Sequence, residues 1–388
     1  MIPLPVRRTL QAHPFSPAVN AASNHHGGPG AVRAGELDGG GDGAPPSSEV
    51  VNRTGLTSVS CLLIGLVGAM LTVAPCRAAA PATLVATRTL LLDARTFGQT
   101  VVAVGASGHI IRSTNSGRTW TAASAPSFAT LTGVDFPDDL HGWAVGHDAI
   151  ILHSDDGGLT WSQQYQGPDL QASFLDVCFL DAQTGFVVGA YGQFLATADG
   201  GRTWTTRRII EEDYFLNRIS IGPSGTLYIA GEHGTLLRST DRGATWAAIR
   251  TPYDGSFYGV LPLGSQTLLA HGLRGRVYRS EDDGATWTLA PIDQRVLFAT
   301  AVRLRSGVIV LAGQARSFAV SRDDGRSLAP WEPRPDTGPA KSAEAPTGTP
   351  AAQKPDLPFS AGVAQLVEAP DGTLLAFGEE GVTRLQVP

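Results

Sequence analysis

Ser154-Asp-Asp156-Gly-Gly158-Leu-Thr160-Trp161 is the stretch that decides the fold of this chain, because variants of it recur along the sequence. The copies end at Trp120, Trp161, Trp204, Trp246 and Trp287, and a degraded sixth copy ends at Leu328, with about 42 residues between one copy and the next. A constant period of this length indicates a structural unit repeated along the chain.

The residue types of each copy predict a tight turn between two strands. The acid or amide side chain can accept hydrogen bonds from backbone N–H groups just ahead of it, and the glycine two positions later can adopt a positive φ. The threonine and tryptophan then begin the next strand, where the indole can pack against the neighbouring repeat. We therefore predict a structural role for Asn115, Asp156, Asp199, Asp241, Asp282, Asp323, Trp120, Trp161, Trp204, Trp246 and Trp287.

A second signature precedes each of these turns. It is a short apolar strand that closes on Gly-x-x-Gly, as in Val188-Gly189-Ala-Tyr-Gly192. A seventh copy, Phe377-Gly378-Glu-Glu-Gly381, has no turn signature after it. Short strands punctuated by Gly or Asp fill the remainder of each unit. The pattern predicts an all-β fold, a seven-bladed β-propeller with four-stranded antiparallel blades.

The last repeat contains only three predicted strands. We expect the segment around Ala82 to Thr87, just before the first unit, to supply the missing outer strand of the last blade. This N-terminal strand would close the ring and remove the exposed sheet edges that an open array would leave.

The segments outside the repeats have a different composition. Residues 1–50 are rich in Gly, Pro, Ala and Ser, which predicts a disordered extension or a mis-called start with translation beginning near Val51. Residues 54–76 carry no charge, follow Arg53 and precede an alanine run, which is typical of a secretory signal peptide within residues 51–80. The uncharged stretch is also long enough to be a membrane anchor. Both alternatives predict an exported protein of the periplasm or an equivalent lumen.

A proline-rich stretch interrupts the repeats between the sixth and seventh units. Residues 329–360 combine many prolines with Ala, Lys and Glu. This composition predicts a disordered insertion that loops out between two blades of the propeller at 81–388.

Composition and spacing exclude several kinds of site. A net charge of −6 and a pI near 5.8 argue against nucleic-acid binding, which needs a basic surface. The nine histidines show no metal-ligand spacing, and Cys178 is the only cysteine outside the predicted signal, so we predict no metal and no cofactor. Glycine-rich turns that precede strands cannot form the phosphate cradle of a helix N-terminus.

The turn signature resembles the Asp-box, or BNR repeat. Together with Gly142-Trp-Ala-Val-Gly146, the copy at 154–161 resembles the photosynthesis system II assembly factor family. The similarity covers residues 83–388 apart from the insertion. It implies a seven-bladed propeller on the lumenal or periplasmic side that assists the assembly or stability of a membrane complex.

Asp-boxes also occur in sialidases and other glycosidases, which gives an alternative function. Such an enzyme needs two carboxyl groups across a sugar bond, or a tyrosine nucleophile with an arginine cluster. The dense candidate is the run from Arg207 to Tyr214, which includes Glu211, Glu212 and Asp213. A solvated charged loop is the simpler interpretation, and we assign no catalytic residue.

Propeller geometry predicts which face binds a partner. Turns between the second and third strands emerge on the same face as the loops between blades, opposite the Asp-box turns. The candidate residues on this face are Tyr191, Glu232, His233, Arg274, Arg207, Arg208, Tyr214, Tyr253 and Arg295. Most of these turns are short, and a flat face suits a protein better than a small substrate.

These observations predict a monomeric, non-enzymatic, exported scaffold. Its expected partner is a protein, namely a membrane complex or a subunit of one, and the resemblance implies photosystem II. We expect neither nucleic acid nor a small-molecule substrate.

Overall fold

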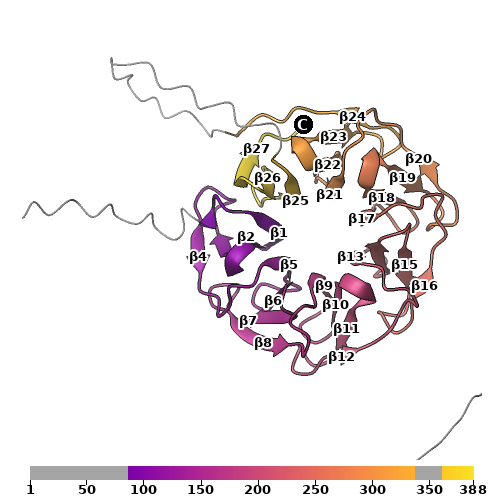
Figure 1. Cartoon of the computed structure of the whole chain (residues 1–388). Helices are drawn as coiled ribbons and strands as arrows, with labels where there is room; N and C mark the ends of the chain where they lie inside the picture. The colour runs from indigo at the N-terminus through magenta and orange to yellow at the C-terminus, as the bar shows by residue number, and fades with distance from the viewer. Residues whose placement is uncertain (1–85, 337–360) are drawn as a thin grey trace, which may run out of the picture. The chain divides into compact units, whose positions relative to one another are not determined.

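The computed structural model of this 388-residue chain describes residues 86–336 and 361–388 (Figure 1). The predicted extension, the signal or anchor, and most of the insertion lie outside these residues. Within the described ranges, no helix has the length and apolar character needed to span a membrane.

Seven antiparallel sheets form a ring of blades, as the repeats predict (Figure 1). The strands follow one another from the inside of each blade outward. Blades 1 to 3 contain β1 (Leu91–Phe97), β2 (Thr100–Gly105), β3 (Ile110–Ser113), β4 (Thr121–Ala123); β5 (Leu131–Asp135), β6 (Gly142–Gly146), β7 (Ile150–Ser154), β8 (Ser162–Gln166); and β9 (Phe174–Phe179), β10 (Gly185–Gly189), β11 (Phe194–Thr197), β12 (Thr205–Thr206).

The remaining blades follow the same order. They contain β13 (Leu216–Ile221), β14 (Leu227–Gly231), β15 (Leu236–Ser239), β16 (Ala247–Ala248); β17 (Phe257–Pro262), β18 (Leu268–Gly272), β19 (Val277–Ser280), β20 (Thr288–Leu289); β21 (Phe298–Arg303), β22 (Ile309–Gly313), β23 (Phe318–Ser321), β24 (Ala329–Pro330); and β25 (Val363–Glu368), β26 (Leu374–Gly378), β27 (Gly381–Leu385). Short 3-10 turns lie between the second and third strands at η1 (Ala106–Gly108), η2 (Ala190–Gly192), η3 (Leu273–Gly275) and η4 (Gln314–Arg316).

Apolar clusters fill the junctions between successive blades. The second strand of each blade is buried along its whole length, as in β10, because both of its faces meet a neighbouring blade. The repeated indoles belong to these junctions. Trp246 of blade 4, for example, packs edge-on against Phe186 and Phe194 of blade 3, with ring centroids 6.5 and 5.6 Å away. The predicted packing of the tryptophans between repeats is thus observed.

The repeated Asp or Asn side chains close their own turns. At Asp241, Oδ1 accepts the Thr245 N–H at 2.9 Å and the Ser239 hydroxyl at 2.7 Å, while Gly243 has a φ of 82°. The matching backbone bond spans 2.8–3.0 Å in the other five turns. The Thr245 hydroxyl and N–H lower the pKa of Asp241 to about 2. These carboxylates are therefore occupied within their own turns.

Two sets of loops emerge on opposite faces of the ring. The turns between strands two and three contact the loops that join successive blades. Gly192 N–H, for example, donates to the Tyr214 carbonyl at 2.7 Å, and Gly234 N–H to that of Gly255 at 2.8 Å. We call this side the loop face. The Asp turns instead contact the loops between strands one and two. The Gly200 N–H, for example, donates to the Gln183 carbonyl at 2.8 Å. We call this side the Asp-turn face.

The outer edge of the last blade contacts the chain that leaves blade 6. The blade has three strands, and its outer strand β27 pairs with Arg334–Asp336: Asp336 N–H donates to the Arg384 carbonyl at 2.9 Å. Most of the predicted outer strand at Ala82–Thr87 lies outside the described residues, and the carbonyl of Thr87, which lies in a turn, accepts the Val382 N–H of β27 at 3.2 Å. Arg334–Asp336 and β24 belong to the stretch 329–360, so the start of that stretch is ordered and differs from the predicted disordered insertion.

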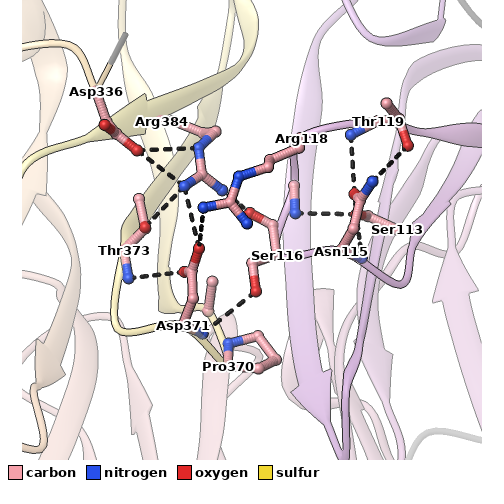
Figure 2. Close-up of polar contacts among 12 residues, drawn as sticks. Ser113, Asn115, Ser116, Arg118, Thr119, Asp336, Pro370, Asp371, Thr373 and Arg384 are labelled. Carbon is pink, nitrogen blue, oxygen red and sulfur yellow. Dashed lines mark hydrogen bonds and ion pairs between the residues drawn. The ribbon is translucent and has the colours of Figure 1, made fainter. Parts of the chain in front are cut away.

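Side chains hold the first and last blades together (Figure 2). The Arg384 guanidinium, 14% exposed, donates to Asp336 and Thr373 at 2.8 Å each and lies 3.3 Å from the Asp371 carboxylate. It also donates to the carbonyl of Ser116 in blade 1. In the described part of the chain, no sheet combines strands from both ends.

Candidate functional site

The loop face brings several predicted residues together at the junction of blades 3 and 4. Tyr191 stands at the apex of η2, is 64% exposed, and packs edge-on against Phe215 with ring centroids 5.2 Å apart. Tyr214 and the exposed His233 lie side by side, with ring centroids 4.4 Å apart. Aromatic surfaces of this kind are enriched where protein interfaces bind tightly.

Two other predicted residues support the loops of this face. The Glu232 carboxylate accepts the Phe215 N–H at 3.0 Å. Tyr253 is half-buried, and its hydroxyl donates to the Leu273 carbonyl at 3.1 Å. Burial raises the pKa of Tyr253. Both residues lie on the predicted face, where they fix the conformation of the loops.

Arg207 does not present its charge on the loop face as the sequence suggested. Its guanidinium donates to the carbonyls of Gly243 and Ala244 at 2.9 and 2.5 Å, in the Asp turn of the next blade. Its cationic group also lies 5.4 Å from the centre of the Phe194 ring. The long side chain thus reaches back toward the Asp-turn face, where it joins two blades.

Arg208 is exposed, but its guanidinium group contacts residues of its own loop. It donates to the Glu211 carbonyl and lies 3.6 Å from the Asp213 carboxylate. Glu211, Glu212 and Asp213 are exposed at the tip of this loop. This arrangement is the solvated charged loop that the sequence favoured, and it gives no pair of carboxyl groups set across an enclosed substrate site.

Blades 5 and 6 place exposed arginines on the loop face. Arg274 forms the apex of η3, Arg276 follows it, and Arg295 lies in the loop between the two blades. Within residues 86–336 and 361–388, none of these three arginines makes an ion pair with a carboxylate. No carboxylate of the described residues therefore competes with a partner for them.

Sequence reasoning missed two exposed apolar residues on this face. Phe128 lies between blades 1 and 2 and is 91% exposed, and Leu170 lies between blades 2 and 3 and is 57% exposed. The available signal was a large apolar residue in an otherwise small or polar loop, Ala125-Pro-Ser-Phe128-Ala. That signal is weak, because single exposed apolar residues are common on protein surfaces.

A cavity of 610 Å³ lies among the inner strands of all seven blades. Asp93, Asp176, Arg218 and His271 line it, and all but Arg218 are at least 96% buried. Arg218 lies 3.6 Å from Asp93 across the ring. These charges were not anticipated, because they lie on separate blades that only the closed ring brings together.

The polar side chains of this cavity connect blades. Asp93, Asp135 and Asp176 accept the N–H groups of Val134, Phe179 and Ile219 in the following blades at 2.7–2.9 Å. The other four junctions have comparable bonds, namely Asn217 to Phe257, His271 to Phe298, Thr300 to Gln365 and Gln365 to Asp93, at 2.6–2.9 Å. Every junction between blades therefore has a hydrogen bond near the central cavity, which gives these polar residues a structural role.

The described residues contain no group of three or more His, Cys, Asp or Glu side chains arranged to hold a metal ion. Cys178 is buried beside the cavity, and its burial raises the pKa of the thiol. The loop face remains the region where exposed aromatic, apolar and cationic side chains gather.

Asp176 should make the stability of the ring depend on pH. Burial, opposed by Arg218 and reinforced by Asp93, raises the pKa of Asp176 from 3.8 to about 7. The folded state then holds a proton that the unfolded state has lost, so stability falls as pH rises through this window. We expect this group to contribute a decrease of up to about 1.4 kcal/mol per pH unit in the free energy of unfolding.

Urea denaturation at several pH values tests this expectation. The stability difference between the wild type and Asp176→Asn should change with pH between about 4 and 7. The exposed Asp254 provides the matched control, since Asp254→Asn should give a flat difference. A difference for Asp176→Asn that is independent of pH would contradict the raised pKa.

Comparisons with known proteins agree with this architecture. The family model described as photosynthesis system II assembly factor YCF48 matches residues 165–330. The photosystem II assembly protein Ycf48 of Thermosynechococcus vestitus is 43% identical over 42 residues, which is 11% of this chain and 12% of that protein. The chain thus aligns with only a small part of this curated relative.

Two solved Ycf48 structures share the fold. Ycf48 bound to a D1 peptide is 19% identical, with a TM-score of 0.59 over 78% of this chain and 93% of the other. Ycf48 from Cyanidioschyzon merolae is 15% identical, with a TM-score of 0.59 over 77% and 96% of the two chains. The chain is thus a seven-bladed β-propeller that resembles the photosynthesis system II assembly factor Ycf48 family over residues 165–330.

Proposed function

We propose that this chain is a non-enzymatic scaffold that binds a protein component of photosystem II and assists the assembly or stability of that membrane complex. The family description supports this role. So does the solved Ycf48 with a D1 peptide bound, since it is a propeller of the same fold in contact with a protein segment. On this proposal the partner is a peptide or protein surface.

The observation that carries the proposal is the set of exposed arginines on the loop face. Arg274, Arg276 and Arg295 lack carboxylate partners among the described residues and come from two adjacent blades. Guanidinium groups form bidentate hydrogen bonds with carboxylates, so this sector suits an acidic segment of a protein partner. The loop face therefore contains the binding site in this proposal.

Capture of photosystem II proteins tests the function. Solubilised photosynthetic membranes would be incubated with immobilised wild-type protein and with an Arg274→Glu/Arg295→Glu variant. We expect the wild type to retain photosystem II subunits and the variant to retain at least about tenfold less, because its new charges repel an acidic partner.

Arg322 provides the matched control for this experiment. It is exposed within an Asp turn, on the opposite face, so Arg322→Glu should capture the same proteins as the wild type. Equal capture by the Arg274→Glu/Arg295→Glu variant would contradict the proposed site. Hydrolysis of chromogenic sialosides or glucosides, abolished by Glu211→Gln or Glu212→Gln, would contradict the non-enzymatic role.

The proposal includes export and a monomeric state. The uncharged segment at residues 54–76 supports export, either as a cleaved signal or as a retained anchor. N-terminal sequencing of the protein from fractionated cells would distinguish these two forms. Recovery of the full-length chain from the cytoplasm alone would contradict export.

A further inference from the structure

Three consecutive blade junctions each expose one bulky apolar side chain on the loop face. Phe128 projects between blades 1 and 2, Leu170 between blades 2 and 3, and Tyr191 at the junction of blades 3 and 4, where it contacts Phe215. Their exposed fractions are 91%, 57% and 64%. We call these three residues the apolar arc.

The core does not require the apolar arc. The junctions beneath it are filled by buried clusters that include Ala129, Ala172 and Leu216, while the three arc residues remain largely exposed. One exposed apolar residue would need no explanation. Three of them at successive junctions of one face are the observation on which the inference rests.

Acidic residues flank the apolar arc. Asp148 lies in the turn of blade 2, Asp169 precedes Leu170, and Glu211, Glu212 and Asp213 form the exposed loop tip between blades 3 and 4. Apart from Arg208, whose charge is paired within its loop, the exposed arginines of this face lie outside the loops that hold the arc residues; they include Arg88, Arg250, Arg274, Arg276 and Arg295. The loops around Leu170 and Tyr191 are thus acidic.

We infer that the apolar arc docks a protein segment with an apolar centre and basic flanking residues. The apolar centre would cover Phe128, Leu170 and Tyr191, and the flanking lysines or arginines would meet the acidic loops. An anionic bilayer is a poorer occupant, since its surface would be repelled by the same acidic loops. This inference rests on the proposed function, because it assumes that the loop face binds protein.

Binding of designed peptides to the full chain tests the inference. One fluorescent peptide would have a Leu/Val/Phe core flanked by lysines, and a second would have the same core flanked by glutamates. We expect the wild type to bind the lysine-flanked peptide at least about tenfold more tightly. Phe128→Ser/Leu170→Ser/Tyr191→Ser should weaken that binding at least about tenfold.

The opposite face supplies a matched control. Leu140 and Leu159 are 56% and 55% exposed and lie on the Asp-turn face of blade 2, so Leu140→Ser/Leu159→Ser should leave peptide binding unchanged. Because all five residues are exposed, the variants should keep the wild-type fold. Matching near-ultraviolet circular dichroism spectra would verify this.

Three results would overturn the inference. They are equal peptide binding by the triple variant, tighter binding of the glutamate-flanked peptide, and Phe128-dependent binding to liposomes with no peptide preference. The photosystem capture experiment remains separate, because it depends on Arg274 and Arg295. Normal capture by the arginine variant would contradict the arginine site alone, and failure of the wild type to retain photosystem II subunits would contradict the proposed function. Failed peptide binding with normal wild-type capture would contradict the apolar arc alone.

Discussion

Replacing Arg384 with methionine is expected to lower the free energy of unfolding by about 3–5 kcal/mol. This guanidinium is the common partner of Asp336, Asp371 and Thr373 in blade 7, and of the Ser116 carbonyl in blade 1 (Figure 2). Methionine would keep the apolar stem and remove the guanidinium group that Asp336 and Asp371 share, although Arg118 still lies 3.0 Å from Asp371. The junction between blades 1 and 7 should weaken most.

Urea denaturation and hydrogen exchange would measure this effect. Faster exchange should appear first in β1 and β27, which lie in blades 1 and 7. Arg322→Met is the control, because Arg322 is exposed and forms no ion pair among the described residues. A loss below about 1 kcal/mol, or a change spread evenly over all blades, would contradict a role for Arg384 in ring closure.

Replacing Asp93 with leucine is expected to cost about 3 kcal/mol or more. The Asp93 carboxylate accepts the Val134 N–H at 2.9 Å and the Gln365 side-chain N–H at 2.8 Å. It also lies 3.6 Å from the Arg218 guanidinium. One side chain of blade 1 thus contacts blades 2, 4 and 7, and its loss would leave buried donors without a partner.

A graded series makes this expectation specific. Asp93→Asn should cost less than Asp93→Leu, since its amide oxygen can still accept one N–H bond. A double-mutant cycle with Arg218→Met should show coupling of at least about 0.5 kcal/mol, because the two groups face each other across the channel. Additive effects of Asp93→Leu and Arg218→Met would contradict the proposed interaction between Asp93 and Arg218.

The repeated turn explains why the fold was predictable from the sequence. Each copy is locally complete: Asp241 bonds to Ser239 and Thr245, and Gly243 supplies the positive φ. Such contacts span four residues and need no distant partner. The number of blades, the order of strands and the two faces follow from repeating this local unit.

Contacts between blades were less predictable. Arg207 follows an outer strand, so its sequence position suggested the loop face, but its long side chain reaches the carbonyls of the next Asp turn. The pairing of β27 with Arg334–Asp336 was not expected, because the composition of residues 329–360 predicted a disordered insertion. Several segments could satisfy that edge by pattern alone, and the path of the chain around the ring decides between them.

The amino-acid sequence by itself determined the seven-fold repeat and the turn chemistry, because these depend on residues close together in the chain. The tertiary structure decided how the ring closes, which charges meet in the central cavity, and which loop residues remain free for a partner. These properties depend on side chains from different blades. Asp93 and Gln365 are 272 residues apart and become neighbours only when the first blade meets the last.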